Sequence, residues 1–182
     1  RPAQAAYARR HLEAAKQAVE IFSRRIYPYP WPSMTVIDPP PDAAGGAGGM
    51  EYPMVVTTAG DYPFSGTLLL PEYVTVHEVG HNWFQGLLAS NEVREPWLDE
   101  GMNEYAGGIV MEEWQGQERA LGHLLGAGIE YYQLERIRGD WAEMAAPIAT
   151  VSHEFPTNDE YGLSVYSRTA IVLKTLENVV GK

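Results

Sequence analysis

The stretch HEVGH, residues 77–81, is followed after 18 further residues by Glu100, and this spacing decides how the chain is interpreted. Residues i and i+4 of a helix lie about 40° apart around the helix axis. His77 and His81 can therefore aim ring nitrogens at one metal ion from consecutive turns. Glu78 projects from a neighbouring stripe, where it can reach a metal-bound water without being a ligand itself.

A hydrolytic zinc site uses three protein ligands and one open position, whereas a structural zinc site closes all four positions, usually with thiolates. The chain contains no cysteine, so two imidazoles and one carboxylate form the plausible ligand set. Glu100 is the best candidate for the third ligand because it lies in a predicted helix, residues 96–114, that begins at a proline. We expect one Zn²⁺ per chain, bound by His77, His81 and Glu100, with Glu78 as the general base.

Residues around Glu100 are candidates for a supporting role, because a histidine that binds a metal normally donates its other N–H to a carboxylate or carbonyl group. Asp99 directly precedes Glu100, and Glu104 follows it by one helical turn. We expect one or both carboxylates to orient the two histidines.

The other histidines lack such a pattern. His153 and Glu154 repeat the first two letters of the motif, but Thr157 stands where a second histidine would be required. We predict that this pair lies in a loop. His11 and His123 have no partner at helical spacing, and surface or packing roles are expected for both.

Composition limits the class of protein. A length of 182 residues is expected to give one domain, residues 1–182, and a hydrophobic fraction of 45% argues against disorder. No apolar run approaches the roughly 20 residues that cross a bilayer. The absence of cysteine excludes disulfides without indicating a compartment. A net charge of −11 disfavours nucleic acid, which binds to clusters of Lys and Arg.

Apolar spacing predicts the first elements. Residues near the N-terminus recur at intervals of three and four, which predicts an amphipathic helix that ends near Tyr27. These residues are Ala8, Leu12, Ala15, Val19, Phe22 and Ile26. Two short β-branched stretches, Thr35–Ile37 and Met54–Thr58, predict strands of a small sheet. Between them lies a proline- and glycine-rich insert at residues 39–49.

Helical patterns dominate the remainder. Beyond Pro71, apolar or small residues at helical spacing predict that the helix carrying HEVGH is mostly buried. Residues 96–114 and 117–138 are predicted to be further helices, and a proline-containing connection at 145–158 leads to a last helix from about residue 163. Two strands early in the chain and helices late in it predict an α+β fold.

The motifs resemble those of the aminopeptidase N family of gluzincin zinc metallopeptidases. HEVGHNWF at residues 77–84 and WLDEGMNEY at 97–105 are similar to the zinc helix and the WLNEG segment of that family. GGMEY at 48–52 resembles its GAMEN exopeptidase motif, and VYSR at 165–168 resembles its VYSKG segment. The resemblance spans nearly the whole chain. It implies a thermolysin-like catalytic domain and flanking domains, so that the chain would be a fragment of a larger multidomain peptidase.

The resemblance also implies roles for single residues. Glu51 would pair with the α-ammonium group of a substrate and admit only a free N-terminus. Tyr166 would donate its phenolic hydrogen to the oxyanion of the transition state. The backbone of Gly48, Gly49 and Met50 would contact an extended substrate. The chain departs from the family at Tyr52, Asp99, Arg168 and Thr169, where the family has asparagine, asparagine, lysine and glycine.

These features predict a zinc-dependent aminopeptidase that hydrolyses the N-terminal peptide bond of peptides. Two alternatives remain from the sequence. The chain could bind metal as a catalytically inactive scaffold or truncated fragment, or it could be an endopeptidase of thermolysin type. In the last case Glu51 would be dispensable.

Overall fold

The computed structural model describes residues 2–40, 48–60, 62, 65–140 and 146–181. Its helices are α1 (Pro2–Arg25), α3 (Leu70–Gly80), α4 (Met102–Gln115), α5 (Tyr131–Asp140), α6 (Asn158–Tyr161) and α7 (Thr169–Val180). Its strands are β1 (Thr35–Ile37), β2 (Val55–Thr57), β3 (His123–Leu124) and β4 (Ala127–Gly128). Two π-helical segments, η1 (Trp97–Gly101) and η4 (Gly162–Arg168), directly precede α4 and α7, and two short 3₁₀ turns are η2 (Gln117–Arg119) and η3 (Ser152–Glu154).

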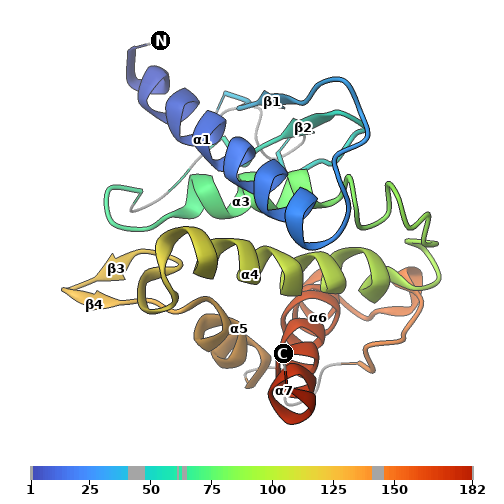
Figure 1. Cartoon of the computed structure of the whole chain (residues 1–182). Coiled ribbons are helices and arrows are strands. Elements are labelled where there is room, and N and C mark those ends of the chain that lie inside the picture. Colours follow the sequence, from blue (N-terminus) through green and yellow to red (C-terminus); the bar gives the residue numbers. More distant parts are fainter. Residues whose placement is uncertain (1, 41–47, 61, 63–64, 141–145, 182) are drawn as a thin grey trace.

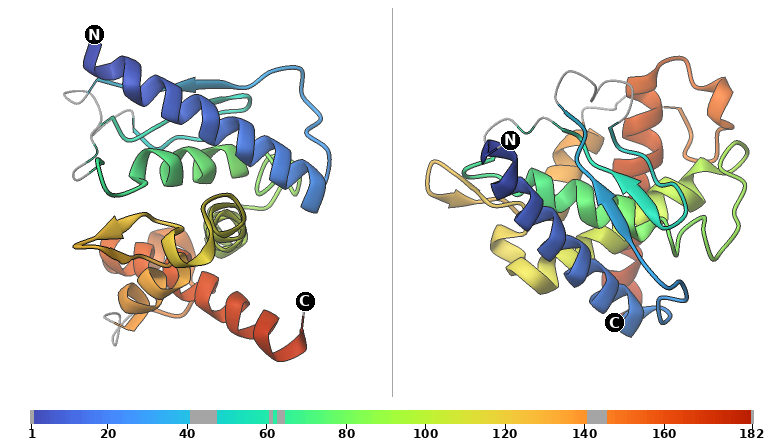
Figure 2. Two further views of the ribbon diagram at one scale, coloured as in Figure 1. Left: turned by 60° about the vertical axis from the view of Figure 1, so that its left-hand side comes forward. Right: turned by 90° about the horizontal axis from the view of Figure 1, so that it is seen from above.

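The elements form stacked layers. In Figure 1, α1 and the strands β1 and β2 lie above α3, α4 crosses the middle, and α5, α6 and α7 lie below. Figure 2 shows the same order from the side, with α4 between the upper and lower groups. Helix α3 contacts α1, β2 and α4, and α4 contacts α5 and α7. This mixture of helices and small sheets agrees with the predicted α+β class.

The predicted N-terminal helix is confirmed as α1, but part of its buried face was predicted wrongly. Leu12 and Ile26 are 57% and 48% exposed. Ala15 and Phe22 are buried as predicted, and the other buried side chains of α1 are those of His11, Ala14, Ala18 and Ile21. Small alanine side chains let α1 lie close to α3, and that packing selects the buried face, which spacing alone did not identify.

The two predicted strands are confirmed as β1 and β2. They pair in parallel, with Val36 opposite Val56. Met50 adds an antiparallel bridge on the other edge of β2, through two hydrogen bonds with Thr57. Residues 41–47 of the predicted insert lie outside the described residues.

A close contact between α3 and α4 depends on Gly80. A Cβ atom at this position would collide with the Oδ1 atom of Asn103 and lie 3.1 Å from the ring of Phe22. Asn103 also donates a hydrogen bond from Nδ2 to the carbonyl oxygen of His77, at 2.7 Å. The helix that carries HEVGH is therefore held directly against α4.

The predicted helix over residues 117–138 is wrong for its first half. This segment begins with the 3₁₀ turn η2 and the β3–β4 hairpin, and only α5 is an α-helix. Gly122 and Gly126 have φ values of 98° and 87°, which belong to a turn and interrupt a helix. The prediction relied on apolar residues at helical spacing and did not take these glycines into account.

The other predicted helices are confirmed with changes at their ends. The helix at 96–114 begins with the π-helical residues of η1, and the last helix is preceded by α6 and η4. His153 and Glu154 are exposed in the short 3₁₀ turn η3, within the predicted connection at 145–158. His11 lies on the buried face of α1, where its Nδ1 lies 2.7 Å from the hydroxyl of Thr75 in α3.

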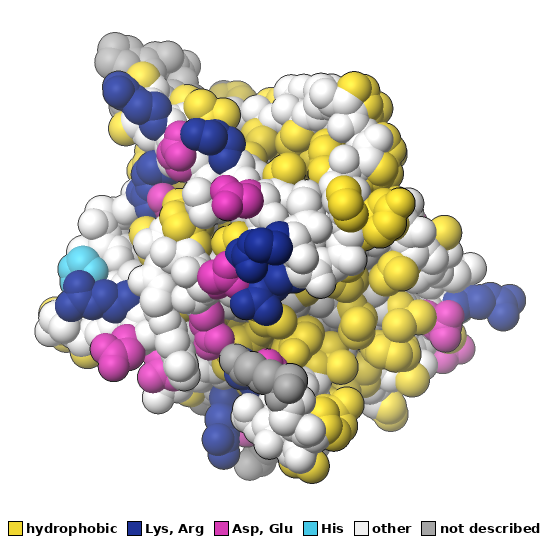
Figure 3. Space-filling view, viewed as in Figure 1, with side chains coloured by type: hydrophobic (Ala, Val, Ile, Leu, Met, Phe, Trp, Pro, Cys, Tyr) yellow, Lys and Arg dark blue, Asp and Glu magenta, His cyan; other side chains and the backbone are white. Residues whose placement is uncertain are grey.

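Apolar side chains remain on the outer surface of α7, namely those of Val172, Leu176, Val179 and Val180. Figure 3 shows hydrophobic side chains gathered on the face where α4 and α7 lie. No helix in the described part of the chain has both the length and the apolar character needed to span a bilayer.

Gly80→Ala is expected to destabilise the protein by about 1–3 kcal/mol, because the added methyl group overpacks the contact with Asn103. The free energy of unfolding, measured by denaturant titration, tests this. Gly66→Ala is the matched control, since a methyl group there meets nothing within 4 Å. Equal stability of the two variants would contradict the proposed close packing.

Candidate metal centre

Three predicted ligands meet at one point between α3 and η1. His77 lies in the last turn of α3, and His81 directly follows that helix with helical backbone angles. Glu100 comes from η1, whose π-helical turn precedes α4. The Nε2 atoms of His77 and His81 lie 3.2 Å apart, and each lies 3.1 Å from Oε2 of Glu100. These three potential ligand atoms form a triangle, which we call the metal triangle.

The triangle fits a tetrahedral metal ion. Ligand atoms bound to Zn²⁺ at 2.0–2.1 Å in tetrahedral geometry lie about 3.3–3.4 Å from one another. Within the described ranges, the metal-compatible group that contains His77 and His81 is completed by Glu100, without a fourth side chain. Two imidazoles, one carboxylate and an open position form the donor set of a catalytic zinc site.

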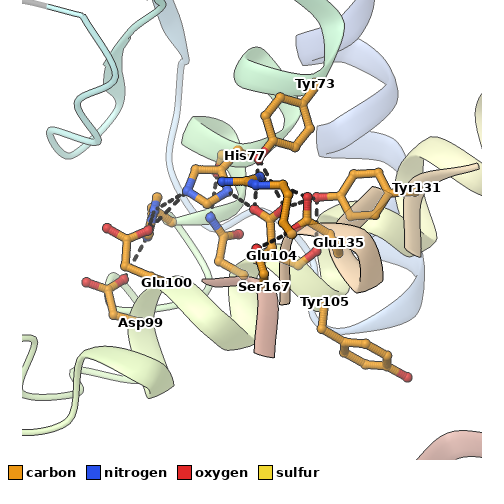
Figure 4. Close-up of polar contacts among 12 residues, drawn as sticks. Tyr73, His77, Asp99, Glu100, Glu104, Tyr105, Tyr131, Glu135 and Ser167 are labelled. Atoms are coloured by element: carbon orange, nitrogen blue, oxygen red, sulfur yellow. Dashed lines mark hydrogen bonds and ion pairs between the residues drawn. The ribbon is translucent and has the colours of Figure 1, made fainter. Parts of the chain in front are cut away.

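Both histidines contact a second carboxylate through their other ring nitrogen. His81 Nδ1 lies 2.7 Å from Oδ1 of Asp99, which is 2% exposed. His77 Nδ1 lies 3.0 Å from Oε2 of Glu104, although the alignment of this contact falls short of a good hydrogen bond. Figure 4 shows Asp99 and Glu104 on opposite sides of the group. These contacts are the ones predicted for ligand-orienting carboxylates.

The residues that hold Glu104 in place were not predicted from the sequence. The hydroxyls of Tyr73 and Tyr131 donate hydrogen bonds to Oε1 of Glu104, at 3.0 and 2.8 Å. Tyr73 precedes His77 by one helical turn, so its spacing could have revealed it. Tyr131 comes from α5, and no local pattern connects it with the motif.

The charges around the histidines favour a cation. Burial alone lowers the pKa of His77, but the carboxylates of Glu100 and Glu104 outweigh this effect and raise it well above its usual value. Burial also lowers the pKa of His81, whereas Asp99 and Glu100 raise it to about 9. Burial raises the pKa of Glu100, but the two histidines bring it far below its usual range. The pocket therefore stabilises positive charge where the three ligand atoms meet.

The carboxyl group of Glu78 faces a cavity of about 500 Å³ beside the triangle. The cavity is lined by residues that include Gly48, Gly49, Tyr73, His77, Glu78 and Tyr166. Gly49 has a φ of +63°, and a Cβ atom there would lie 3.4 Å from Oε1 of Glu78. Burial raises the pKa of Glu78 to about 7, against the opposing effect of the two histidines.

Tyr166 lies against the predicted ligands. Its ring stacks on the imidazole of His77, with ring centroids 5.6 Å apart and an interplanar angle of 20°. Burial raises the pKa of Tyr166 strongly, and the neighbouring carboxylate of Glu100 raises it further. The hydroxyl group is thus protonated and close to the metal triangle.

Glu51 lines a cavity beside His81. This second cavity, of about 570 Å³, is lined by Glu51, His81 and Trp31, among other residues. The carboxylate of Glu51 lies within 4.8 Å of those of Glu92 and Asp99. Burial raises the pKa of Glu51, and positive charge on His81 opposes this effect. Glu92 was not singled out from the sequence, because it is an exposed residue outside the motifs.

Asp99→Ala is expected to weaken zinc binding about 10- to 100-fold, because His81 would lose the carboxylate that orients its ring. Competition with a chromophoric chelator measures the dissociation constant. Asp159→Ala is the matched control, since it removes the same charge from an exposed site in α6. Equal affinity of the two variants would contradict an orienting role for Asp99.

Comparison with known proteins agrees with this geometry. The model of the peptidase family M1 domain matches residues 10–182. The chain is 27% identical over 168 residues to a leukotriene A-4 hydrolase homolog of Botryotinia fuckeliana (strain B05.10), and the match covers 90% of this chain and 25% of that protein. The chain thus spans about a quarter of the length of this relative. The family match covers most of the chain, which therefore belongs to peptidase family M1, the zinc metallopeptidase family that its motifs resemble.

Proposed function

We propose that the protein is a zinc-dependent aminopeptidase, built on a thermolysin-like catalytic unit, that hydrolyses the N-terminal peptide bond of peptides. The observation that carries this proposal is the triangle of His77, His81 and Glu100, with ligand atoms 3.1–3.2 Å apart. Family membership supports metallopeptidase chemistry. The preference for N-termini is an inference from Glu51.

The chemistry begins with proton transfer. Bound Zn²⁺ would polarise the scissile carbonyl group and lower the pKa of a coordinated water to about 7. Glu78, which is 6% exposed and lines the cavity beside His77, would accept a proton from the attacking water. The same carboxyl group would then give a proton to the departing amine, which is too basic to leave as an anion.

Tyr166 would stabilise the developing oxyanion. Its hydroxyl group is protonated, and its ring is held against His77 by stacking. One positioned donor typically contributes about 2.7–4 kcal/mol to the transition state. The phenol is therefore suited to donate a hydrogen bond to the carbonyl oxygen during attack.

Glu51 would bind the free amino group of the substrate. One cavity is lined by His77 and Glu78, and the other is lined by His81 and Glu51. A peptide that lies across the triangle could place its N-terminal residue beside Glu51 and its following residues along Gly48 and Gly49. Met50 uses both of its backbone groups to pair with Thr57, so the backbone groups of its neighbours face away from β2, where an extended peptide could pair with them.

The two alternatives make different predictions. An inactive scaffold would bind zinc without turnover, although the cluster of Glu78, Tyr166 and the three ligands supports an intact catalytic set. A thermolysin-type endopeptidase would cleave inside peptides and would not need Glu51. The carboxylate of Glu51 beside Asp99 and His81 supports recognition of an amine, because it adds negative charge next to the cleavage point.

Glu78→Gln is expected to lower kcat by about 10²–10⁴-fold while the protein still binds one zinc ion, because the amide cannot accept the proton. Steady-state kinetics and metal analysis measure the two effects separately. Glu118→Gln, an exposed substitution in η2, serves as the control. Retained turnover in Glu78→Gln would exclude this residue as the general base.

The role of Glu51 is tested with a matched aminoacyl amide whose amine is either free or acetylated. We expect cleavage of the free form only. Glu51→Gln should lower kcat/KM for the free form by about 10- to 100-fold, because a charge-assisted hydrogen bond is lost. Equal cleavage of the free and acetylated substrates would instead support the endopeptidase.

A further inference from the structure

The position of Tyr166 depends on the segment that carries it. Tyr166 lies in η4, a π-helical segment that contacts α5, α6, α7 and η1. The catalytic role proposed above requires its hydroxyl to be held within about 0.5 Å of the productive position. Stacking on His77 fixes the plane of the ring but permits sliding within that plane. A hydrogen bond from a neighbouring residue of η4 would restrict this sliding.

Glu135 of α5 makes such a contact. Its side chain is 1% exposed, and its Oε2 atom accepts a hydrogen bond of 2.6 Å from the hydroxyl of Ser167. Ser167 is fully buried and directly follows Tyr166 in the chain. The other oxygen, Oε1, accepts a hydrogen bond of 2.9 Å from Arg138. The side chain of Arg138 is 40% exposed and so reaches water, whereas Ser167 is enclosed.

The same face of α5 also contacts the metal side of the site. Tyr131 precedes Glu135 by four residues, and its hydroxyl donates to Glu104, whose carboxylate faces His77. Figure 4 shows Tyr131, Glu135 and Ser167 grouped around Glu104. One helical face of α5 therefore contacts both Glu104, which faces His77, and Ser167, which follows Tyr166. Through these two contacts, α5 relates the position of Tyr166 to that of His77.

We propose that Glu135 is a positioning residue, which holds Tyr166 in register with the metal ligands through its hydrogen bond to Ser167. The inference rests on the proposed function, since it concerns the oxyanion donor of that reaction. Glu135 itself lies behind the site and does not touch the substrate. The length and orientation of its side chain matter because the carboxylate must reach from α5 to Ser167 in η4.

Three variants separate the effect of the length of the Glu135 side chain from the effect of its charge. Glu135→Asp keeps the charge but withdraws the carboxylate by about 1.5 Å, the length of one carbon–carbon bond. Ser167→Ala removes the donor with a smaller change in the core. Glu135→Gln removes the charge but keeps the reach, and either end of its amide can hydrogen bond to the serine hydroxyl. Ser164→Ala is the control, because this buried serine of η4 bonds to the carbonyl of Ala146 and not to α5.

Kinetics supply the first readout. We expect Glu135→Asp and Ser167→Ala to lower kcat by roughly 10- to 100-fold with KM changed less than about twofold, since loss of an oxyanion donor itself costs 10²–10³-fold. Glu135→Gln and Ser164→Ala should remain within about threefold of the unaltered protein. The double variant Glu135→Asp/Ser167→Ala should be no slower than the worse single variant.

A second readout is independent of turnover. In protein labelled with 3-fluorotyrosine, the fluorine resonance that disappears in Tyr166→Phe identifies this ring. We expect that resonance to move or broaden in Glu135→Asp and Ser167→Ala, while zinc content stays at one ion per chain. A protein without peptidase activity would contradict the proposed function, and the resonance would still test the positioning role.

Two outcomes would overturn the inference. One is an unchanged kcat and an unchanged Tyr166 resonance in both Glu135→Asp and Ser167→Ala. The other is an equal loss in Ser164→Ala, because any damage to η4 would then explain the effect. If Glu135→Asp fails to fold, Ser167→Ala alone decides between these results.

Discussion

The contact between α3 and α4 is the constraint on which the metal group depends. Of the three proposed ligands, His77 lies in the last turn of α3, His81 directly follows that helix, and Glu100 lies in η1, which leads directly into α4. Asn103 of α4 hydrogen bonds to the backbone of His77, and Gly80 leaves room for that amide. A shift of α3 along α4 would separate Glu100 from the histidines, so backbone packing sets the ligand geometry before a metal binds.

The second constraint is charge. Asp99, Glu104 and Glu78 are each less than a tenth exposed, and Glu100 lies among them. Buried carboxylates at such density are costly unless cations or hydrogen bonds compensate. Two tyrosine hydroxyls satisfy Glu104, and the two histidines lie between the remaining acids. A divalent cation at the triangle would complete this compensation, which links metal binding to the stability of the surrounding core.

The sequence predicted the parts of this site that have a local signature. HEVGH and the spacing to Glu100 depend on helix geometry, and the carboxylates beside Glu100 follow from ordinary histidine chemistry. The first half of the helix over 117–138 was predicted wrongly because glycines at 122 and 126 outweigh apolar spacing, whereas its second half is confirmed as α5. Tyr131, Glu135 and Ser167 could not be predicted, since tertiary packing of α5 and η4 brings them to the site across a long stretch of chain.

The most direct measurement of the central claim is anomalous diffraction at the zinc absorption edge, from crystals of the zinc-loaded protein. The account predicts one peak at about 2.0–2.2 Å from Nε2 of His77, Nε2 of His81 and the carboxylate of Glu100, with solvent at the fourth position. A peak elsewhere would contradict it. So would a fourth protein ligand, such as Glu78, in the position that the substrate carbonyl group must reach.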